Sequence, residues 1–466
     1  MASRIFASIS RLSSNGCITV NIIKSGHKLG LQFDTISVAN NTRALSTSGR
    51  VFQEPQKDHH HHVNERHHNE AHHHLPNQCA PISSQLNFIE PSSIPRVPAY
   101  RVLNPDGSLN DDLDPTLTDD KIVSMYEQMV QLNAFDKIMF DSQRQGRISF
   151  YMTNFGEEAV AFGSAAALDG RDWIFAQYRE AGILLQRGMP LKLMLAQCYG
   201  NKEDLGKGRQ MPIHYGNRSL NFAPISSPLT VQLPQAAGTA YALKQRGEGQ
   251  IVVTYFGEGA ASEGDAHAAM NFAATLDCPI IFFCRNNGYA ISTPTNEQYA
   301  SDGIVNRGLG YGMSSVRVDG NDLFAVYAVT RRARHLCQHE SRPCLIEAMT
   351  YRVGHHSTSD DSSAYRSADE VRQWEQEVGP LKRVYNYLCA QGLWSEERQT
   401  ACLKEARANV IEALNWAESI KKLPVSSMFD DVYDELPDSL RRQRDELKEH
   451  LEKYGKHYPL AEHEGI

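Results

Sequence analysis

The sequence IVVTYFGEG at residues 251–259 is followed by DAHAAMNFAATL at 265–276 and by PIIFFCRNNGY at 279–289. The first and third segments begin with short β-branched and aromatic runs, which are typical of buried parallel strands. The middle segment is rich in Ala and Met and has one apolar helical face. A right-handed crossover between the strands brings residues 257–259 beside residues 285–287. We therefore predict an α/β fold, with a mostly parallel sheet and a site at these strand ends.

The turn after the first strand combines glycine with an acid. Glycine-rich turns before a helix bind diphosphates, because backbone N–H groups and the helix dipole attract negative charge. An anion there, Glu258, is tolerable if a divalent cation separates it from the diphosphate. The Glu258 carboxylate and the Asn287 side-chain oxygen are therefore candidate Mg²⁺ ligands. A nicotinamide site is an alternative, but its Gly-x-Gly-x-x-Gly pattern would need glycine where Ser262 stands.

Several further sequence motifs are spread over most of the chain. They are SFYMTNFGEEA (149–159), AQYREAG (176–182), GKGRQMPIHYG (206–216), ISSPL (225–229), RNNGYAIST (285–293) and HHSTSDDSSAYRS (355–367). From about Phe88 onward, the chain resembles the alpha subunit of the mitochondrial branched-chain 2-oxoacid dehydrogenase component, in a plant-like form. The resemblance implies a thiamine-diphosphate-binding fold. It also implies oxidative decarboxylation of branched-chain 2-oxoacids, with transfer of the acyl group to a lipoyl carrier.

The resemblance also implies roles for individual residues. The implied cofactor contacts are Tyr178, Arg179, Ser227, Leu229, Gly257, Gly259, Ala260, Arg285 and His356. Tyr289 would join Glu258 and Asn287 at Mg²⁺, and His356 would act in proton transfer during acyl transfer. A potassium site would use Ser226, Pro228 and Gln232, but Val231 stands where the family has threonine. Ser357 and Ser367 resemble phosphorylation sites.

The partners implied by the resemblance are other protein chains. A beta subunit would complete an α2β2 heterotetramer and would supply the carboxylate that activates the cofactor. A lipoyl-bearing acyltransferase core would accept the acyl group, and a kinase and phosphatase would act on the serines. The pyruvate dehydrogenase alpha subunit is an alternative, although Glu258, the pair His355-His356 and GRQMPIHYG favour the branched-chain member. A non-catalytic scaffold that retains the fold is a further alternative.

The composition excludes some classes of partner. The 466-residue chain has a formal net charge of −8, which argues against a nucleic-acid binder. It contains no run near the roughly 18 apolar residues of a membrane span. The nine cysteines form no C-x-x-C pair, so they are most simply reduced, buried thiols of an intracellular protein.

The chain divides into five predicted regions. Residues 1–50 hold six basic residues against one acid, Asp34, which is typical of a presequence for import into the mitochondrial matrix. Chloroplast targeting is the alternative, and residues 4–12 are expected to form a short amphipathic helix. Residues 51–87 are a disordered linker with nine histidines, and residues 88–117 form an extended arm. The diphosphate-binding domain spans 118–365, and a helical region spans 366–466.

Overall fold

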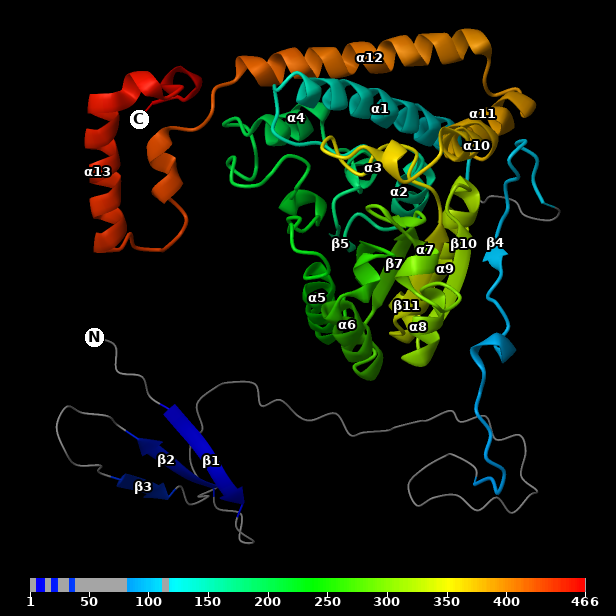
Figure 1. Ribbon diagram of the computed structural model, residues 1–466, viewed down its shortest axis with the longest axis horizontal. Helices are drawn as coiled ribbons and strands as arrows, with labels where there is room; N and C mark the ends of the chain where they lie inside the picture. The colour runs from blue at the N-terminus through cyan, green and yellow to red at the C-terminus, as the bar shows by residue number, and fades with distance from the viewer. Residues whose placement is uncertain (1–5, 13–17, 24–32, 38–81, 111–116, 466) are drawn as a thin grey trace. The chain divides into compact units, whose positions relative to one another are not determined.

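The computed structural model describes residues 6–12, 18–23, 33–37, 82–110 and 117–465 (Figure 1). The chain divides into two units, Met1–Asn87 and Phe88–Ile466. In the first unit, β1 (Phe6–Leu12), β2 (Ile18–Ile23) and β3 (Phe33–Ser37) form an antiparallel sheet in that order. The amphipathic helix predicted for residues 4–12 is therefore wrong. Isoleucine and serine, both present in this segment, have low helix propensity, and isoleucine favours strands. The presequence cleavage region and most of the histidine-rich linker lie outside the described residues.

Six strands of the second unit form one parallel sheet, in the order β4-β10-β11-β7-β6-β5. Their bounds are β4 Ala99–Tyr100, β5 Trp173–Phe175, β6 Val252–Gly257, β7 Ile280–Asn286, β10 Ser314–Asp319 and β11 Cys344–Met349. This topology confirms the predicted parallel α/β fold. The predicted strand–helix–strand unit is β6, α6 (Gly264–Thr275) and β7, and its two strands are neighbours inside the sheet.

Helices cover both faces of the sheet. Those before the central unit are α1 Asp119–Arg144, α2 Glu158–Ala166, α3 Ala181–Gln186, α4 Leu191–Tyr199 and α5 Gln232–Arg246. Those after β7 are α7 Thr295–Gln298, α8 Val305–Gly310, α9 Leu323–Glu340, α10 Ala368–Glu377, α11 Pro380–Ala390, α12 Glu396–Ser419 and α13 Asp438–Tyr454. A short hairpin of β8 (Tyr289–Ala290) and β9 (Thr293–Pro294) follows β7. Among the described residues, no helix combines the length and apolar character that membrane crossing requires.

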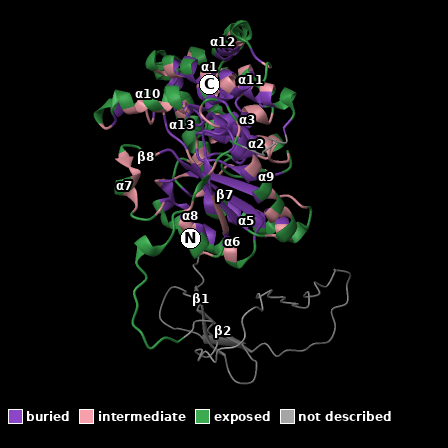
Figure 2. Cartoon of the chain, turned by 90° about the vertical axis from the view of Figure 1, so that its right-hand side faces the viewer, coloured by how far each residue is buried: buried purple, intermediate pink, exposed green. Residues whose placement is uncertain are grey.

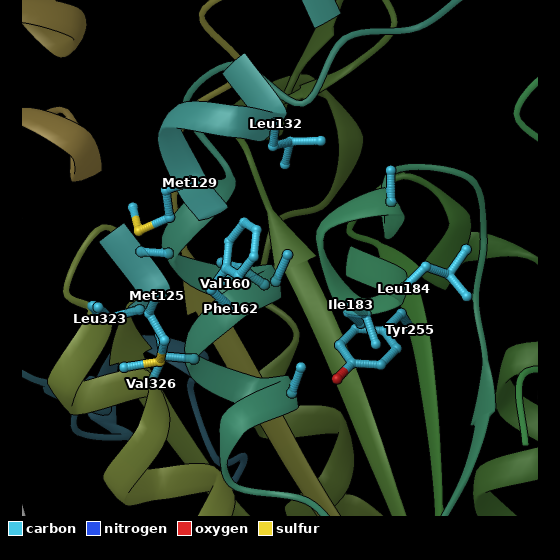
Figure 3. Close-up of a cluster of buried hydrophobic side chains, with 14 of the residues drawn as sticks. Met125, Met129, Leu132, Val160, Phe162, Ile183, Leu184, Tyr255, Leu323 and Val326 are labelled. Carbon is cyan, nitrogen blue, oxygen red and sulfur yellow. The ribbon is translucent and has the colours of Figure 1, made fainter. Parts of the chain in front are cut away.

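Alternate residues of the central strands face two different helical layers, as the two-residue period of a strand requires. Tyr255 and Phe283 belong to a core that includes side chains of α1, α2, α3 and α9 (Figure 3). Phe256 and Phe282 belong to a second core, against α5 and α6. The strands are therefore buried on both faces, and Figure 2 shows β7 in the interior.

The arm and the carboxyl-terminal helices attach to this sheet. The strand β4 pairs with β10 at the sheet edge, and the N–H groups of Val102 and Leu103 donate to Asp322 Oδ2 at 2.6 and 2.7 Å. The other oxygen of Asp322 caps α9. The helix α12 packs along α1 and α4 (Figure 1). These contacts join both ends of the second unit to the domain that carries the site.

Candidate active site

A cavity of about 370 Å³ lies at the carboxyl ends of β6 and β7. Parallel strands end together at this edge of the sheet, where the sequence predicted the site. Eleven predicted residues line the cavity: Tyr178, Ser227, Leu229, Gly257, Glu258, Gly259, Ala260, Arg285, Asn287, Tyr289 and His356. The other lining residues are Phe150, Met152, Gln177, Met211, His214, Ala290, Ile291 and Arg352. The cavity thus combines an apolar wall with a cluster of polar groups.

The turn at residues 257–260 lies tightly against its neighbours. The N–H of Gly257 donates to Gln177 Oε1 at 2.7 Å, which links the end of β6 to the segment after β5. A Cβ atom at Gly259 would lie only 2.4 Å from the Cβ of Ala290. Glycine is therefore required at 259, because the β8 strand packs directly on this turn.

Glu258 and Asn287 lie side by side, as the sequence predicted. The backbone N–H of Asn287 donates to Glu258 Oε2 at 3.3 Å. Glu258 is 2 % exposed, and its Oε1 atom has no hydrogen-bond partner among the described residues. Burial raises the pKa of Glu258 to about 7. A buried carboxylate oxygen without a partner is the kind of atom that a hard cation satisfies.

Glu157 fixes the orientation of Asn287, a role that the sequence analysis missed. Its Oε1 accepts from Asn287 Nδ2 at 2.9 Å, and its Oε2 accepts from Arg285 Nη1 at 2.6 Å. Arg179 Nε lies 3.8 Å from Oε1. Burial opposes ionisation of Glu157, but Arg285 and Arg179 outweigh it and hold its pKa below the ordinary value. With its nitrogen held by Glu157, the Asn287 amide directs its oxygen elsewhere, and among the described residues this oxygen accepts only from Tyr289 N at 3.3 Å.

Glu180 organises the residues after β5. Its Oε2 accepts from the N–H groups of Gln177 and Tyr178 at 3.0 and 2.8 Å, and its Oε1 accepts from Arg285 Nε at 2.6 Å. Arg179 therefore pairs with Glu157 and not with its sequence neighbour Glu180, which pairs with Arg285. The guanidinium of Arg285 is thus held between two buried carboxylates.

His356 is buried beside two guanidinium groups. Its Nδ1 lies 3.4 Å from Arg179 Nη2 and 3.4 Å from Arg352 Nη1, and its backbone N–H donates to Asp360 Oδ2 at 2.8 Å. Burial, together with Arg179 and Arg352, lowers the pKa of His356 to about 3. The imidazole is therefore neutral, with Nδ1 facing donors. Its proton then resides on Nε2, which can donate a hydrogen bond to a ligand.

The opposite wall places Ser227 against His214. The Ser227 hydroxyl lies 3.0 Å from His214 Nε2, and the Nδ1 of that ring lies 3.1 Å from the carbonyl of Pro212. The carbonyl can only accept, so Nδ1 carries the proton and Nε2 accepts from Ser227. The direction of the Ser227 hydroxyl is thereby fixed.

Three β-branched residues at the cavity have left-handed backbone conformations. They are Ile213 (φ 67°), Thr230 (φ 66°) and Ile291 (φ 59°). The first two adjoin lining residues, and Ile291 lines the cavity itself. Such conformations are rare for β-branched side chains and cost about 1–3 kcal/mol each. Strain of this kind concentrates where the fold holds a functional site.

Some predicted residues lie outside the cavity wall. Arg179 is 2 % exposed and donates to the carbonyl of His356 at 2.5 Å. Ser226, Pro228 and Gln232 precede or begin α5, and Gln232 Nε2 donates to the Tyr255 carbonyl at 3.0 Å. Val231 is the amino-terminal cap of that helix.

The two serines predicted as phosphorylation sites differ in exposure. Ser357 is buried, at 8 % exposure, whereas the exposed Ser367 caps α10 by accepting from Glu370 N at 3.1 Å. The Ser367 side chain is open to solvent in the observed conformation. Ser357 becomes accessible only if its loop moves.

The chain is similar to a family model and to several named mitochondrial proteins. A family model described as "Dehydrogenase E1 component" matches residues 126–426. The mitochondrial 2-oxoisovalerate dehydrogenase subunit alpha of Homo sapiens is 57 % identical over 387 residues, which cover 83 % of this chain and 87 % of that protein. The protein of the same name in Caenorhabditis elegans is 55 % identical over 391 residues, with coverages of 84 % and 90 %. Subunit alpha 1 of Arabidopsis thaliana is 45 % identical over 462 residues, 98 % of each chain.

Proposed function

The chain belongs to the dehydrogenase E1 component family, and from that premise we propose that it is the alpha subunit of a mitochondrial branched-chain 2-oxoacid dehydrogenase. The reaction is the oxidative decarboxylation of acids such as 3-methyl-2-oxobutanoate, with transfer of the acyl group to a lipoyl carrier. The observation that carries the proposal is the buried, unpartnered Oε1 of Glu258 beside Asn287, within a glycine turn at the strand ends.

The family depends on thiamine diphosphate, and the residues present fit this cofactor with Mg²⁺. Glu258, the Asn287 oxygen and the Tyr289 carbonyl would hold the metal, which suits the preference of Mg²⁺ for oxygen ligands. Arg179, Arg285 and His356 would bind or offset the charge of the diphosphate, and Tyr178, Ser227 and Leu229 would contact the rest of the cofactor. When bound, the cofactor supplies the electron sink for decarboxylation.

The protein's own groups orient the reactants and move protons. The neutral His356 donates from Nε2, so it can hold a diphosphate oxygen or pass a proton during acyl transfer. The Ser227 hydroxyl is aimed by His214. Apolar lining residues such as Phe150 and Met152 suit a branched apolar substrate better than pyruvate.

A beta subunit completes the proposed site. The activating carboxylate at the aminopyrimidine ring would come from that chain, in an α2β2 heterotetramer. A surface suited to it is the outer face of α5 and α6, where Tyr241, Phe272 and Leu276 are 42 %, 61 % and 41 % exposed. Clusters of exposed apolar side chains mark interaction surfaces. A lipoyl-bearing acyltransferase core would then accept the acyl group.

The proposal includes regulation by phosphorylation and a potassium site. Phosphate on Ser357 would add negative charge and bulk beside His356, and so oppose diphosphate binding. Ser367 would be a second, exposed target of the kinase and phosphatase.

A potassium ion held by the carbonyls of Ser226 and Pro228 and by Gln232 would stabilise the start of α5. Because Val231 lacks a hydroxyl, we expect Val231→Thr to raise the affinity for K⁺, measured as K⁺-dependent thermal stabilisation against Na⁺.

Co-expression with a beta subunit tests the proposed function. The purified assembly should decarboxylate 3-methyl-2-oxobutanoate faster than pyruvate, and thiamine diphosphate with Mg²⁺ should raise its melting temperature whereas NAD should not. The chain without a beta subunit should be inactive. A preference for pyruvate would assign the chain to the alternative subunit, and stabilisation by NAD alone would overturn the proposal. The relatives are named mitochondrial, and import into the matrix can be followed with a fluorescent fusion.

A further inference from the structure

The helix α10, which follows the predicted diphosphate-binding domain, contacts the rest of the protein mainly through polar and aromatic side chains. Within the described structure, every one of its residues is at least partly exposed (Figure 2). Burial of apolar area therefore contributes little to holding it in place. Its best-defined contacts come from two side chains. Trp374 stacks on Tyr351 with ring centroids 5.0 Å apart, and Glu370 forms hydrogen bonds with tyrosine hydroxyls.

Glu370 joins two tyrosines that come from different segments. Its Oε1 accepts from Tyr289 Oη at 2.9 Å and from Tyr351 Oη at 2.8 Å. The carboxylate is held in place because Ser367 caps the first turn of α10 through Glu370 N, at 3.1 Å. Hydrogen bonds to a charged acceptor are stronger than those between neutral groups. Glu370 is thus a strong attachment point between α10 and the β8 strand.

Tyr289 occupies a sensitive place beside the proposed metal site. Its backbone N–H donates to Asn287 Oδ1 at 3.3 Å, so its main chain adjoins a proposed ligand directly. The following residue, Ala290, packs on Gly259. Ile291 then has a left-handed backbone, at φ 59°. A strained hairpin of this kind persists only where surrounding contacts hold it.

We propose that Glu370 is a positioning residue for the metal site. By holding the Tyr289 hydroxyl, it adds a side-chain anchor to the main-chain contacts of Arg352, which donates to the carbonyls of Tyr289 and Ile291 at 3.4 and 2.7 Å. The anchor helps to preorganise the Asn287 oxygen and the Tyr289 carbonyl for Mg²⁺. This inference rests on the proposed function. Loss of the Glu370 contact leaves the hairpin with the Arg352 contacts but without this anchor before the metal binds, so the metal and cofactor bind more weakly. Once the metal and the cofactor are bound, their own contacts hold the hairpin. The rate of the chemical step is therefore unchanged.

The test uses the full-length chain assembled with its beta subunit. We compare Glu370→Ala and Glu370→Gln with Asp369→Ala, a matched control in the same helical turn whose carboxylate is exposed and pairs with Arg372. Isothermal titration calorimetry measures the affinity for thiamine diphosphate with Mg²⁺, and steady-state kinetics separates kcat from the half-saturating cofactor concentration.

Glu370→Ala should weaken cofactor binding about ten-fold while kcat at saturating cofactor stays within about two-fold. Glu370→Gln, which retains an acceptor, should restore most of the affinity. Tyr289→Phe removes only the hydroxyl and should show the same loss of cofactor affinity as Glu370→Ala, with no further loss of affinity when the two are combined. This variant also tests the inference if Glu370→Ala does not fold.

Equal cofactor affinity in Glu370→Ala and Asp369→Ala, or a fall in kcat with unchanged affinity, would overturn the inference. Additive losses in the combined variant would do the same. If the wild-type assembly itself fails to bind thiamine diphosphate with Mg²⁺, the proposed function fails, and the positioning role fails with it.

Discussion

At the scale of single residues, the site depends on buried acids that have unequal sets of partners. Glu157 is surrounded by Arg285, Arg179 and Asn287 and is held ionised. Glu258 has one backbone donor and an oxygen with no protein partner among the described residues. The first acid therefore contributes to the structure of the free protein, whereas the second gains a full set of contacts only when a ligand is present.

Replacing Glu258 should separate activity from stability. For Glu258→Ala we expect activity of the assembly to fall at least about a hundred-fold, because a metal ligand is lost. The unfolding free energy of the cofactor-free protein should change by less than about 1 kcal/mol, since the cost of a lost contact is offset by removal of an unpaired buried oxygen. Activity assays and urea unfolding measure the two effects. Glu263→Ala, an exposed acid at the start of α6, is the control, and an active Glu258→Ala assembly would contradict a catalytic role for the site.

Glu158 should make stability depend on pH. Burial raises its pKa to about 8, from an ordinary value of 4.5, and Asp136 adds to this effect. The folded chain therefore holds this proton more tightly than the unfolded chain, and its stability falls as the pH rises from about 5 to about 8. In Glu158→Gln this loss is absent, so the variant should gain stability relative to wild type across that window. Urea unfolding at each pH measures the difference in unfolding free energy between Glu158→Gln and wild type. A difference that does not change with pH would refute the assignment of this pH dependence to Glu158.

Ser357 provides a test of charge at the site. Ser357→Glu places a carboxylate next to His356 in sequence, in a loop held by Thr358 and Asp360. We expect the half-saturating concentration of thiamine diphosphate to rise at least about ten-fold, through repulsion of the diphosphate. Ser363→Glu, an exposed position in the same loop, is the control. Full cofactor affinity in both Ser357→Glu and a phosphorylated preparation would remove the switch.

Individual residues differed in how far the sequence could locate them. Glu258 and Asn287 follow two consecutive strands, so the crossover rule alone brings them together. Glu157 and Glu180 come from segments about a hundred or more residues away, and their pairing with Arg285 is set by the packing of α2 and α3 on the sheet. The adjacent acids Glu157 and Glu158 in NFGEEA were the available signal. Nothing in the local sequence, however, distinguishes a buried pair of acids from a solvent-exposed pair.

At the scale of elements, the two strands of the central unit were predicted correctly, whereas the amino-terminal segment was not. The apolar runs at 251–256 and 279–284 are too short for helices and became β6 and β7. The segment Phe6–Leu12 is also short, and there the structure has a strand where a helix was predicted. Short apolar runs carry little information on period, so flanking turns and length must decide.

The face of α5 and α6 gives a prediction for assembly. Phe272, 61 % exposed on α6, should lie under the beta subunit. Phe272→Glu should weaken the assembly by at least about ten-fold in dissociation constant, because a buried charge would replace an aromatic contact. Leu309→Glu on α8, where the leucine is 55 % exposed, is the matched control. Analytical ultracentrifugation measures both, and an intact heterotetramer from Phe272→Glu would exclude this face.

At the scale of the whole molecule, all predicted site residues belong to the unit Phe88–Ile466. A chain that begins at Ile82 should therefore bind thiamine diphosphate with Mg²⁺ as tightly as the full chain when assembled with the beta subunit. The same deletion should abolish import into isolated mitochondria. Calorimetry and an import assay test the two statements separately. A ten-fold loss of cofactor affinity would show that the first unit contributes to the site.

The pairing of β4 with β10 affects how the protein is made. These neighbours in the sheet are more than 200 residues apart in sequence, so the arm has no partner strand until residues 314–319 have also reached the matrix and can fold. Such long-range parallel pairing also slows folding itself. The imported, unfolded polypeptide therefore exposes an unpaired edge, and matrix chaperones that shield extended segments should raise its yield.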